Sequence, residues 1–172
     1  MGMAEIRTAR LLLRPASPRD LDAIHAILSD PRATEFWSTL PHSDMAQTEA
    51  WLSSMLAIET HEGEDFVIER DGQVIGKAGF YRFPEIGFIL HPREWGKGYA
   101  REALQAILDR AFKVHHLSAV EADVDPRNAS SLRLLEGLGF ERTGHASNTW
   151  NIGGKWYDSV YLGLRNPASD SD

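Results

Sequence analysis

Gly96 and Gly98 are the residues whose type and spacing point most clearly to chemistry. They follow an apolar segment that ends at Leu90 and precede a predicted helix. The helix is predicted because apolar residues recur at the i, i+3, i+4, i+7 spacing; these are Ala100, Ala103, Leu104, Ile107, Leu108, Ala111 and Phe112. A glycine-rich turn that leads into a helix leaves several backbone N–H groups unpaired, and the helix dipole adds positive potential there. The sequence therefore predicts a binding site for the phosphates of a cofactor.

Two common phosphate motifs are excluded by inspection. The chain contains no Gly-Lys-Ser or Gly-Lys-Thr, so it has no P-loop. The third glycine of a dinucleotide-binding fingerprint would stand where the chain has Arg101. The pattern that remains is Arg93-x-x-Gly96-x-Gly98-Tyr99-Ala100.

This pattern resembles the pyrophosphate loop of the GNAT superfamily of acetyl-CoA-dependent N-acetyltransferases. A second block, Asn128-Ala-Ser-Ser131 followed by Gly139-Phe140, is similar to a segment of the same family. Arg10-Leu-Leu-Leu-Arg14 resembles the opening of the branch that contains the ribosomal-protein N-terminal acetyltransferases, the Rim type. Gly154-Lys-Trp-Tyr-Asp158 fits the closing strand of that branch, so the resemblance covers most of the chain, residues 6–165.

The resemblance implies that the chain binds acetyl-CoA and moves its acetyl group directly to an amine. The pantetheine arm would pair with the strand before the loop, and the pyrophosphate would meet N–H groups of the loop, where glycine leaves no Cβ in the way. Asn128 would bond the amide arm of the cofactor, or would only cap a helix. The cofactor-binding residues predicted in this way are Phe88, Ile89, Leu90, Arg93, Glu94, Trp95, Gly96, Lys97, Gly98, Tyr99, Ala100, Asn128 and Ser131.

Glu85 is the candidate catalytic base, because family members often place a water-relayed glutamate on the strand that leads to the loop. Its alternative interpretation is a surface carboxylate at the start of a strand. Many relatives use a tyrosine in the last helix to protonate the leaving thiolate, and here Leu135 replaces it. Ser131 is the candidate substitute, although it could be only a helix cap, and a thiolate could also leave unaided.

The acceptor pocket would be walled by the connection between the first two helices and by the terminal hairpin. Its predicted residues are Phe36, Trp37, His42, Trp150, Tyr157 and Asp158, which could alternatively be ordinary packing residues. We predict no metal site, because the seven histidines show no His-x-x-x-His spacing.

The pattern of elements predicts an α/β fold. Strands are expected over residues 6–14, 66–69, 74–80, 85–90, 117–124, 141–150 and 155–164, with a hairpin turn at Asp71-Gly72. Helices are expected after caps at Ser17 and Ser43, after the glycine loop, and over residues 128–138. The resemblance implies a mixed, mostly antiparallel central sheet with a splayed parallel strand pair and helices on both faces. We expect residues 1–165 to form one domain and residues 166–172 a polar tail.

Composition narrows the classes of partner. A chain of 172 residues with a formal net charge of −7 is a poor candidate for binding nucleic acid. It has no cysteine, which excludes disulfides and thiolate catalysis. Without a long apolar run or a signal-peptide pattern, the expected location is the cytoplasm, away from the membrane. The acceptor is expected to be a peptide N-terminus or a small-molecule amine. The alternative function is a non-catalytic acyl-CoA sensor on the same fold. The chain could also form a homodimer.

Overall fold

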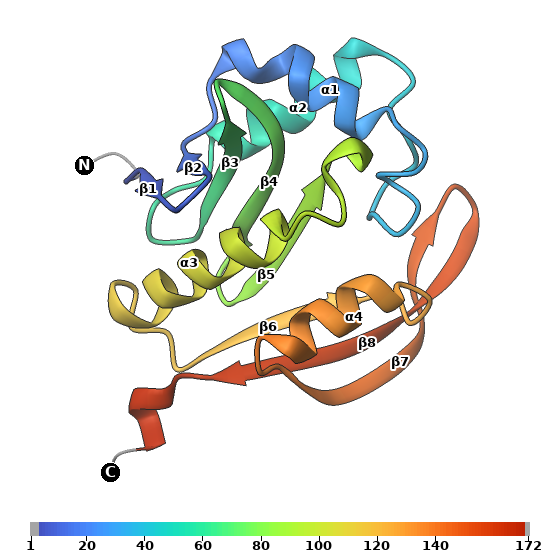
Figure 1. Ribbon diagram of the computed structural model, residues 1–172. Helices are drawn as coiled ribbons and strands as arrows, with labels where there is room; N and C mark the ends of the chain where they lie inside the picture. Colours follow the sequence, from blue (N-terminus) through green and yellow to red (C-terminus); the bar gives the residue numbers. More distant parts are fainter. Residues whose placement is uncertain (1–3, 171–172) are drawn as a thin grey trace.

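The computed structural model describes residues 4–170. In this part of the chain, eight strands form one sheet in the order β1-β2-β3-β4-β5-β6-β8-β7. The strands are β1 Ile6–Arg7, β2 Leu12–Arg14, β3 Glu64–Arg70, β4 Gln73–Arg82, β5 Glu85–Leu90, β6 Ala119–Val124, β7 Glu141–Ile152 and β8 Lys155–Arg165. The helices are α1 Leu21–Leu28, α2 Met45–Leu56, α3 Tyr99–Lys113 and α4 Ala129–Gly137. The predicted α/β class and mixed sheet are confirmed (Figure 1).

The helices cover both faces of the sheet, and each face has its own core. The larger core joins α3 and α4 to the sheet through side chains such as Leu104, Leu135 and Phe140. The smaller core joins α1 and α2 to the opposite face through Ile24, Leu52 and other apolar side chains. The alternation of side chains along β5 follows this division, since Ile86 and Leu90 lie in the first core and Ile89 lies in the second.

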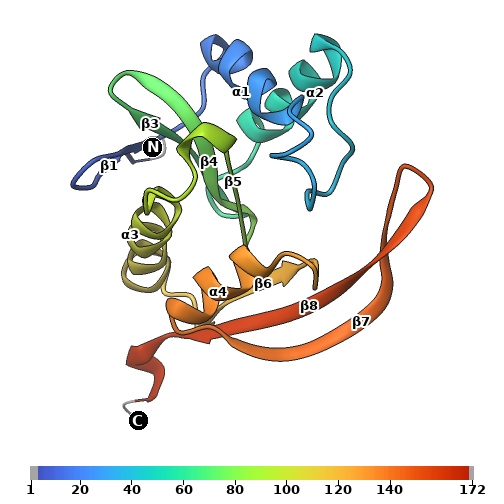
Figure 2. The ribbon, with the colours of Figure 1, turned by 45° about the vertical axis from the view of Figure 1, so that its right-hand side comes forward.

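β5 and β6 are the parallel pair, and they are paired at a single position. Glu85 lies opposite Glu121, and the N–H of Glu121 donates to the carbonyl of Pro84 at 2.9 Å. All other neighbouring strands of the sheet are paired in antiparallel fashion. Figures 1 and 2 show β5 and β6 diverging beyond their contact. The splayed parallel pair predicted from the resemblance is therefore present.

Some boundaries differ from the prediction. Residues 6–14 form a short antiparallel hairpin of two strands, because Thr8–Arg10 turn the chain back. The cap of α2 is Asp44 and not Ser43, since the Asp44 carboxylate accepts the N–H of Gln47 at 2.9 Å. Part of the expected tail is ordered: Pro167–Asp170 form a 3-10 helix. The hairpin turn at Asp71-Gly72 is confirmed, with φ of 50° and 80°.

Candidate active site

The glycine loop presents a row of unused backbone donors. Gly96 and Gly98 have φ of 72° and 80°, in the left-handed region that glycine adopts without strain. Within residues 4–170, the N–H groups of residues 96–98 have no internal acceptor. α3 begins at Tyr99 without a side-chain cap, and in the described part of the chain the N–H groups of Tyr99, Ala100 and Arg101 also lack internal acceptors, whereas that of Glu102 donates to the Gly98 carbonyl at 3.1 Å. These donors and the helix dipole together suit a diphosphate.

The side chains of the loop mainly hold the loop itself. Tyr99 is only 4% exposed and lies in the main core, which leaves its backbone as its contact with a cofactor. The indole N–H of Trp95 donates to the carbonyl of Leu90 at 3.2 Å. The Lys97 ammonium lies 3.3 Å from the Glu94 carboxylate. The backbone N–H of Arg93 donates to the His91 ring at 3.2 Å. The guanidinium of Arg93 is exposed and has no hydrogen bond or ion pair to residues 4–170, so it can meet an anion.

The predicted pantetheine strand has one free edge. Residues Phe88, Ile89 and Leu90 pair with β4 along one side of β5. On the other side, β5 pairs with β6 at Glu85 alone. The backbone groups of β5 beyond that point can therefore pair with an extended ligand, as a further strand would, except for the Leu90 carbonyl that Trp95 occupies.

Asn128 and Ser131 bond to each other at the start of α4. The side-chain oxygen of Asn128 accepts the backbone N–H of Ser131 at 3.2 Å, and its amide donates to the Ser131 hydroxyl oxygen at 3.0 Å. Asn128 is therefore a helix cap in this structure, with one amide N–H to spare for a ligand. Leu135 is fully buried in the main core, so no phenol stands at that position.

Glu85 lies at the point where β5 and β6 part, among other carboxylates. Its side chain is exposed, yet partial desolvation and then the charges of Asp123 and Glu121 raise its pKa. A raised pKa brings a carboxylate closer to the range in which it exchanges protons at neutral pH. The geometry is thus compatible with the predicted base.

Arg127 connects the two walls of the predicted acceptor pocket. Its guanidinium lies 5.3 Å from the ring centroid of Phe36 and 4.7 Å from that of Tyr157. Asp125 holds it through two hydrogen bonds of 2.7 and 3.0 Å. The structure therefore brings the α1–α2 connection and the terminal hairpin together, through an arginine that no sequence motif had singled out.

The remaining predicted pocket residues have different partners. The indole N–H of Trp150 donates to Asp123 at 3.1 Å, which places this wall next to the carboxylates around Glu85. Asp158 accepts the N–H of Asn148 and so stabilises the hairpin. His42 contacts the Thr48 hydroxyl at 2.8 Å, and burial together with the nearby His25 lowers the pKa of His42. Trp37 packs against the smaller core.

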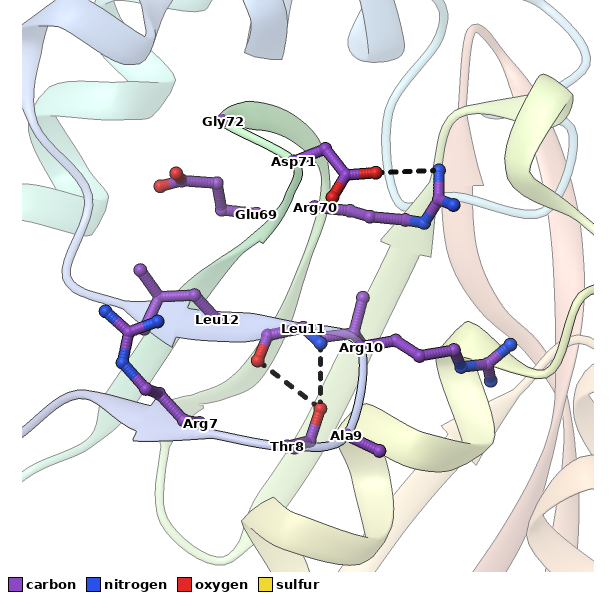
Figure 3. Close-up of a pocket in the computed structure, with 10 residues that line it drawn as sticks. All are labelled: Arg7, Thr8, Ala9, Arg10, Leu11, Leu12, Glu69, Arg70, Asp71 and Gly72. Carbon is purple, nitrogen blue, oxygen red and sulfur yellow. Dashed lines mark hydrogen bonds and ion pairs between the residues drawn. The ribbon is translucent and has the colours of Figure 1, made fainter.

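A cleft of about 570 Å³ lies on another side of the glycine loop. It is lined by the β1–β2 hairpin and the β3–β4 turn, residues 7–12 and 69–72 (Figure 3). Arg10 extends from this cleft toward the start of α3 and donates to the Lys97 carbonyl at 2.9 Å. The same guanidinium binds Glu102 at 2.7 Å and lies over the Tyr99 ring. Arg10 thereby links the glycine loop to the β1–β2 hairpin of the sheet.

We expect Arg10→Met to raise the Kd for CoA about three- to tenfold, because one hydrogen bond to the loop is lost while the backbone donors remain. Titration calorimetry would measure this change. Arg7→Met is the matched control, since Arg7 lines the same cleft and makes no hydrogen bond to the loop within the described residues. Equal Kd values for wild type and Arg10→Met would show that the loop holds its shape without Arg10.

Within residues 4–170, no cluster of three or more His, Cys, Asp or Glu side chains is arranged to hold a metal ion. None of the helices in this described part is long and apolar enough to cross a membrane.

The chain is similar to known acetyltransferases along most of its length. Residues 10–141 match the family model described as acetyltransferase (GNAT) domain. The uncharacterised N-acetyltransferase p20 of Bacillus licheniformis is 32% identical, covering 93% of this chain and 94% of that protein. The L-methionine sulfoximine/L-methionine sulfone acetyltransferase of Pseudomonas aeruginosa is 28% identical, with 88% and 92% covered. The structure of RimL, a ribosomal alpha-N-protein acetyltransferase in complex with coenzyme A, aligns with a TM-score of 0.84 at 17% identity, over 96% of this chain and 99% of that chain.

Proposed function

Because the chain belongs to the Rim-type branch of the GNAT family and is an acetyl-CoA-dependent N-acetyltransferase, we propose that it transfers acetyl directly to a primary amine. The acceptor is a protein N-terminus or a small molecule. The observation that carries the proposal is the single β5–β6 pairing at Glu85 and Glu121, beside a loop of unused backbone donors. Acetyl-CoA supplies the thioester. The chain positions the thioester and the amine and transfers the protons.

The amine must be neutral to attack. Near pH 7.5 about a third of an α-amino group is neutral, against roughly one part in 800 of a lysine side chain. An α-amine therefore needs little help, whereas a lysine needs a strong base. We propose that Glu85 accepts the proton of the attacking amine, directly or through a water, while partial desolvation and then the charges of Asp123 and Glu121 keep its pKa raised.

Ser131 is the proposed proton donor to the leaving thiolate. We expect Ser131→Ala to lower kcat only on the order of tenfold, since a thiolate is a good leaving group near neutral pH. Ser131→Thr keeps the hydroxyl and should retain most of the rate. The Kd for CoA must be measured for both variants, because Ser131 also bonds the Asn128 cap. A fall in kcat that is equal in the two variants would argue against proton donation.

Thiol release from acetyl-CoA tests the proposed function without background from thiols of the protein, because the chain contains no cysteine. The acceptors are peptides with free N-termini, the same peptides with blocked N-termini, and small primary amines, with mass spectrometry of each product. The Pseudomonas aeruginosa relative supports a small acceptor by its name, and RimL supports a protein N-terminus. Tight CoA binding without thiol release from any acceptor would instead indicate a non-catalytic acyl-CoA-binding module.

A further inference from the structure

Arg127 lies beyond the ends of β5 and β6, where the two strands have parted. It belongs to the turn between β6 and α4, on one side of the parting. The α1–α2 connection, residues 29–44, belongs to the other side, because its flanking helices share a core with Val67 of β3 and Ile89 of β5. Figures 1 and 2 show this connection, the β6–α4 turn and the outer part of the β7–β8 hairpin on the same side of the molecule. Arg127 can therefore span the two parts of the sheet.

Contacts from both sides converge on Arg127. Its guanidinium carbon lies 5.3 Å from the ring centroid of Phe36, in the α1–α2 connection, and 4.7 Å from that of Tyr157, in β8. These are distances of cation–π contacts. A second contact joins the same two elements, since a Cβ on Gly153 would lie 2.8 Å from the Leu40 side chain. The two walls of the predicted acceptor pocket thus meet at the hairpin tip and at Arg127.

The turn that carries Arg127 also carries Asn128, the predicted cofactor ligand. The Asp125 carboxylate accepts the backbone N–H of Arg127 at 2.9 Å and two N–H groups of its guanidinium at 2.7 and 3.0 Å. The Asp125 carbonyl accepts the N–H of Asn128 at 2.9 Å. The Asp125 side chain is only 11% exposed. Asp125 thus holds Arg127 toward the acceptor pocket and Asn128 toward the cofactor site.

We propose that Arg127 is a positioning residue that holds both walls of the acceptor pocket in place relative to the cofactor-binding turn. The inference rests on the proposed acetyl transfer and adds a residue that acts through Phe36 and Tyr157 and not on the reacting atoms. Asp125 fixes the guanidinium, and the guanidinium fixes the two rings. The acceptor then meets walls whose place is set by the turn that also binds the cofactor.

The exposure of Arg127 argues against a role in stability alone. Its side chain is 56% exposed, and an ion pair at such a site contributes little to folding. Without this side chain, the backbone N–H groups of Arg127 and Asn128 still bond to Asp125, so the turn and the Asn128 cap should persist. Loss of the side chain should therefore affect the acceptor and spare both the cofactor and the fold.

Arg127→Ala tests this expectation by steady-state kinetics. We expect KM for the acceptor to rise about three- to tenfold, since an exposed cation–π contact corresponds to about a two- to fivefold change in an equilibrium and two such contacts are lost. The change in kcat should be smaller, and the Kd for CoA should stay within about twofold of the wild type. The probes are trialanine, spermidine and L-methionine sulfone, each assayed by thiol release.

Arg142→Ala is the matched control. The Arg142 side chain is 55% exposed and likewise pairs with a carboxylate, that of Glu136, but it lies over no aromatic ring of the described residues. This variant should change neither the acceptor KM nor the Kd for CoA. Arg127→Lys keeps a cation that can lie over the rings, so it should recover part of the acceptor KM.

Hydrogen exchange tests the link between the walls in the free protein, without an acceptor. The N–H of Trp37 donates to the Thr34 carbonyl at 3.0 Å, so its exchange reports opening of the α1–α2 connection. Tyr157→Leu removes a ring from the opposite wall. We expect it to speed this exchange about two- to fivefold when Arg127 is present and to have no effect in Arg127→Ala. The double-mutant comparison isolates the contact that runs through Arg127.

The outcomes separate the positioning role from the proposed function. An unchanged acceptor KM in Arg127→Ala, or an equal loss in acceptor KM, kcat and CoA affinity, would overturn the positioning role and leave acetyl transfer standing. The same effect of Tyr157→Leu on Trp37 exchange with and without Arg127 would overturn it as well. No thiol release with these probes or with the wider set of amines, despite CoA binding, would overturn the proposed function, and the exchange measurement would then still decide whether Arg127 links the walls.

Discussion

Gly96→Asp is expected to raise the Kd for CoA by about 100-fold or more. A carboxylate at this position would face the diphosphate, and two like charges about 5 Å apart at an effective dielectric constant of about 20 repel by about 3 kcal/mol. The loss should come from charge and not from a clash, because a Cβ on Gly96 would meet no heavy atom within 4 Å. Titration calorimetry with CoA measures the change.

Gly96→Asn is the matched control for this variant. Asparagine has nearly the shape of aspartate, tolerates the φ of 72° at this position and carries no charge. We expect its Kd to rise far less than that of Gly96→Asp. If the two variants lose affinity equally, the anion does not lie at this loop, or backbone strain alone explains the loss.

Glu85→Gln is expected to lower kcat/KM at neutral pH by about 100-fold or more, the usual contribution of a general base. The pH profile should change as well. A base acts only when deprotonated, so the wild-type rate must fall as the pH drops through the raised pKa of Glu85. Glu85→Gln should lose this part of the acid limb, because it has no carboxylate to protonate, and should keep only the fall that protonation of the acceptor amine causes. If Glu85→Gln keeps the rate and the pH profile of the wild type, Glu85 is not the base.

Glu121→Gln gives the second half of this test. Its charge is one cause of the raised pKa of Glu85, after desolvation and Asp123. Removing it should lower that pKa and move the acid limb of the profile to lower pH, with little change in the plateau rate. An unshifted limb would mean that another group titrates.

The glycine loop and its helix could be predicted from local sequence, because both depend on neighbouring residues. Glycine at 96 and 98 adopts positive φ without strain, and the apolar spacing over residues 100–112 marks the buried face of α3. The splayed strand pair could not be derived from such spacing. It was predicted from the family resemblance, and the structure contains it.

The features that sequence patterns did not reveal depend on contacts between distant segments. Arg127 was visible in the chain, but its place between Phe36 and Tyr157 requires three separate segments to meet. The hairpin of β3 and β4 was predicted, but its register shift between Ile68 and Glu69 was not. Local patterns cannot fix such a shift.

The central claim is that backbone amides of the loop and the free edge of β5 hold the cofactor. Amide NMR of the labelled chain during titration with CoA tests it directly. We predict saturable shifts that are largest for the N–H groups of residues 96–98, with further shifts over Phe88–Leu90. Shifts confined to the arginine-lined cleft of residues 7–12 and 69–72, or no shifts at millimolar CoA, would contradict the claim.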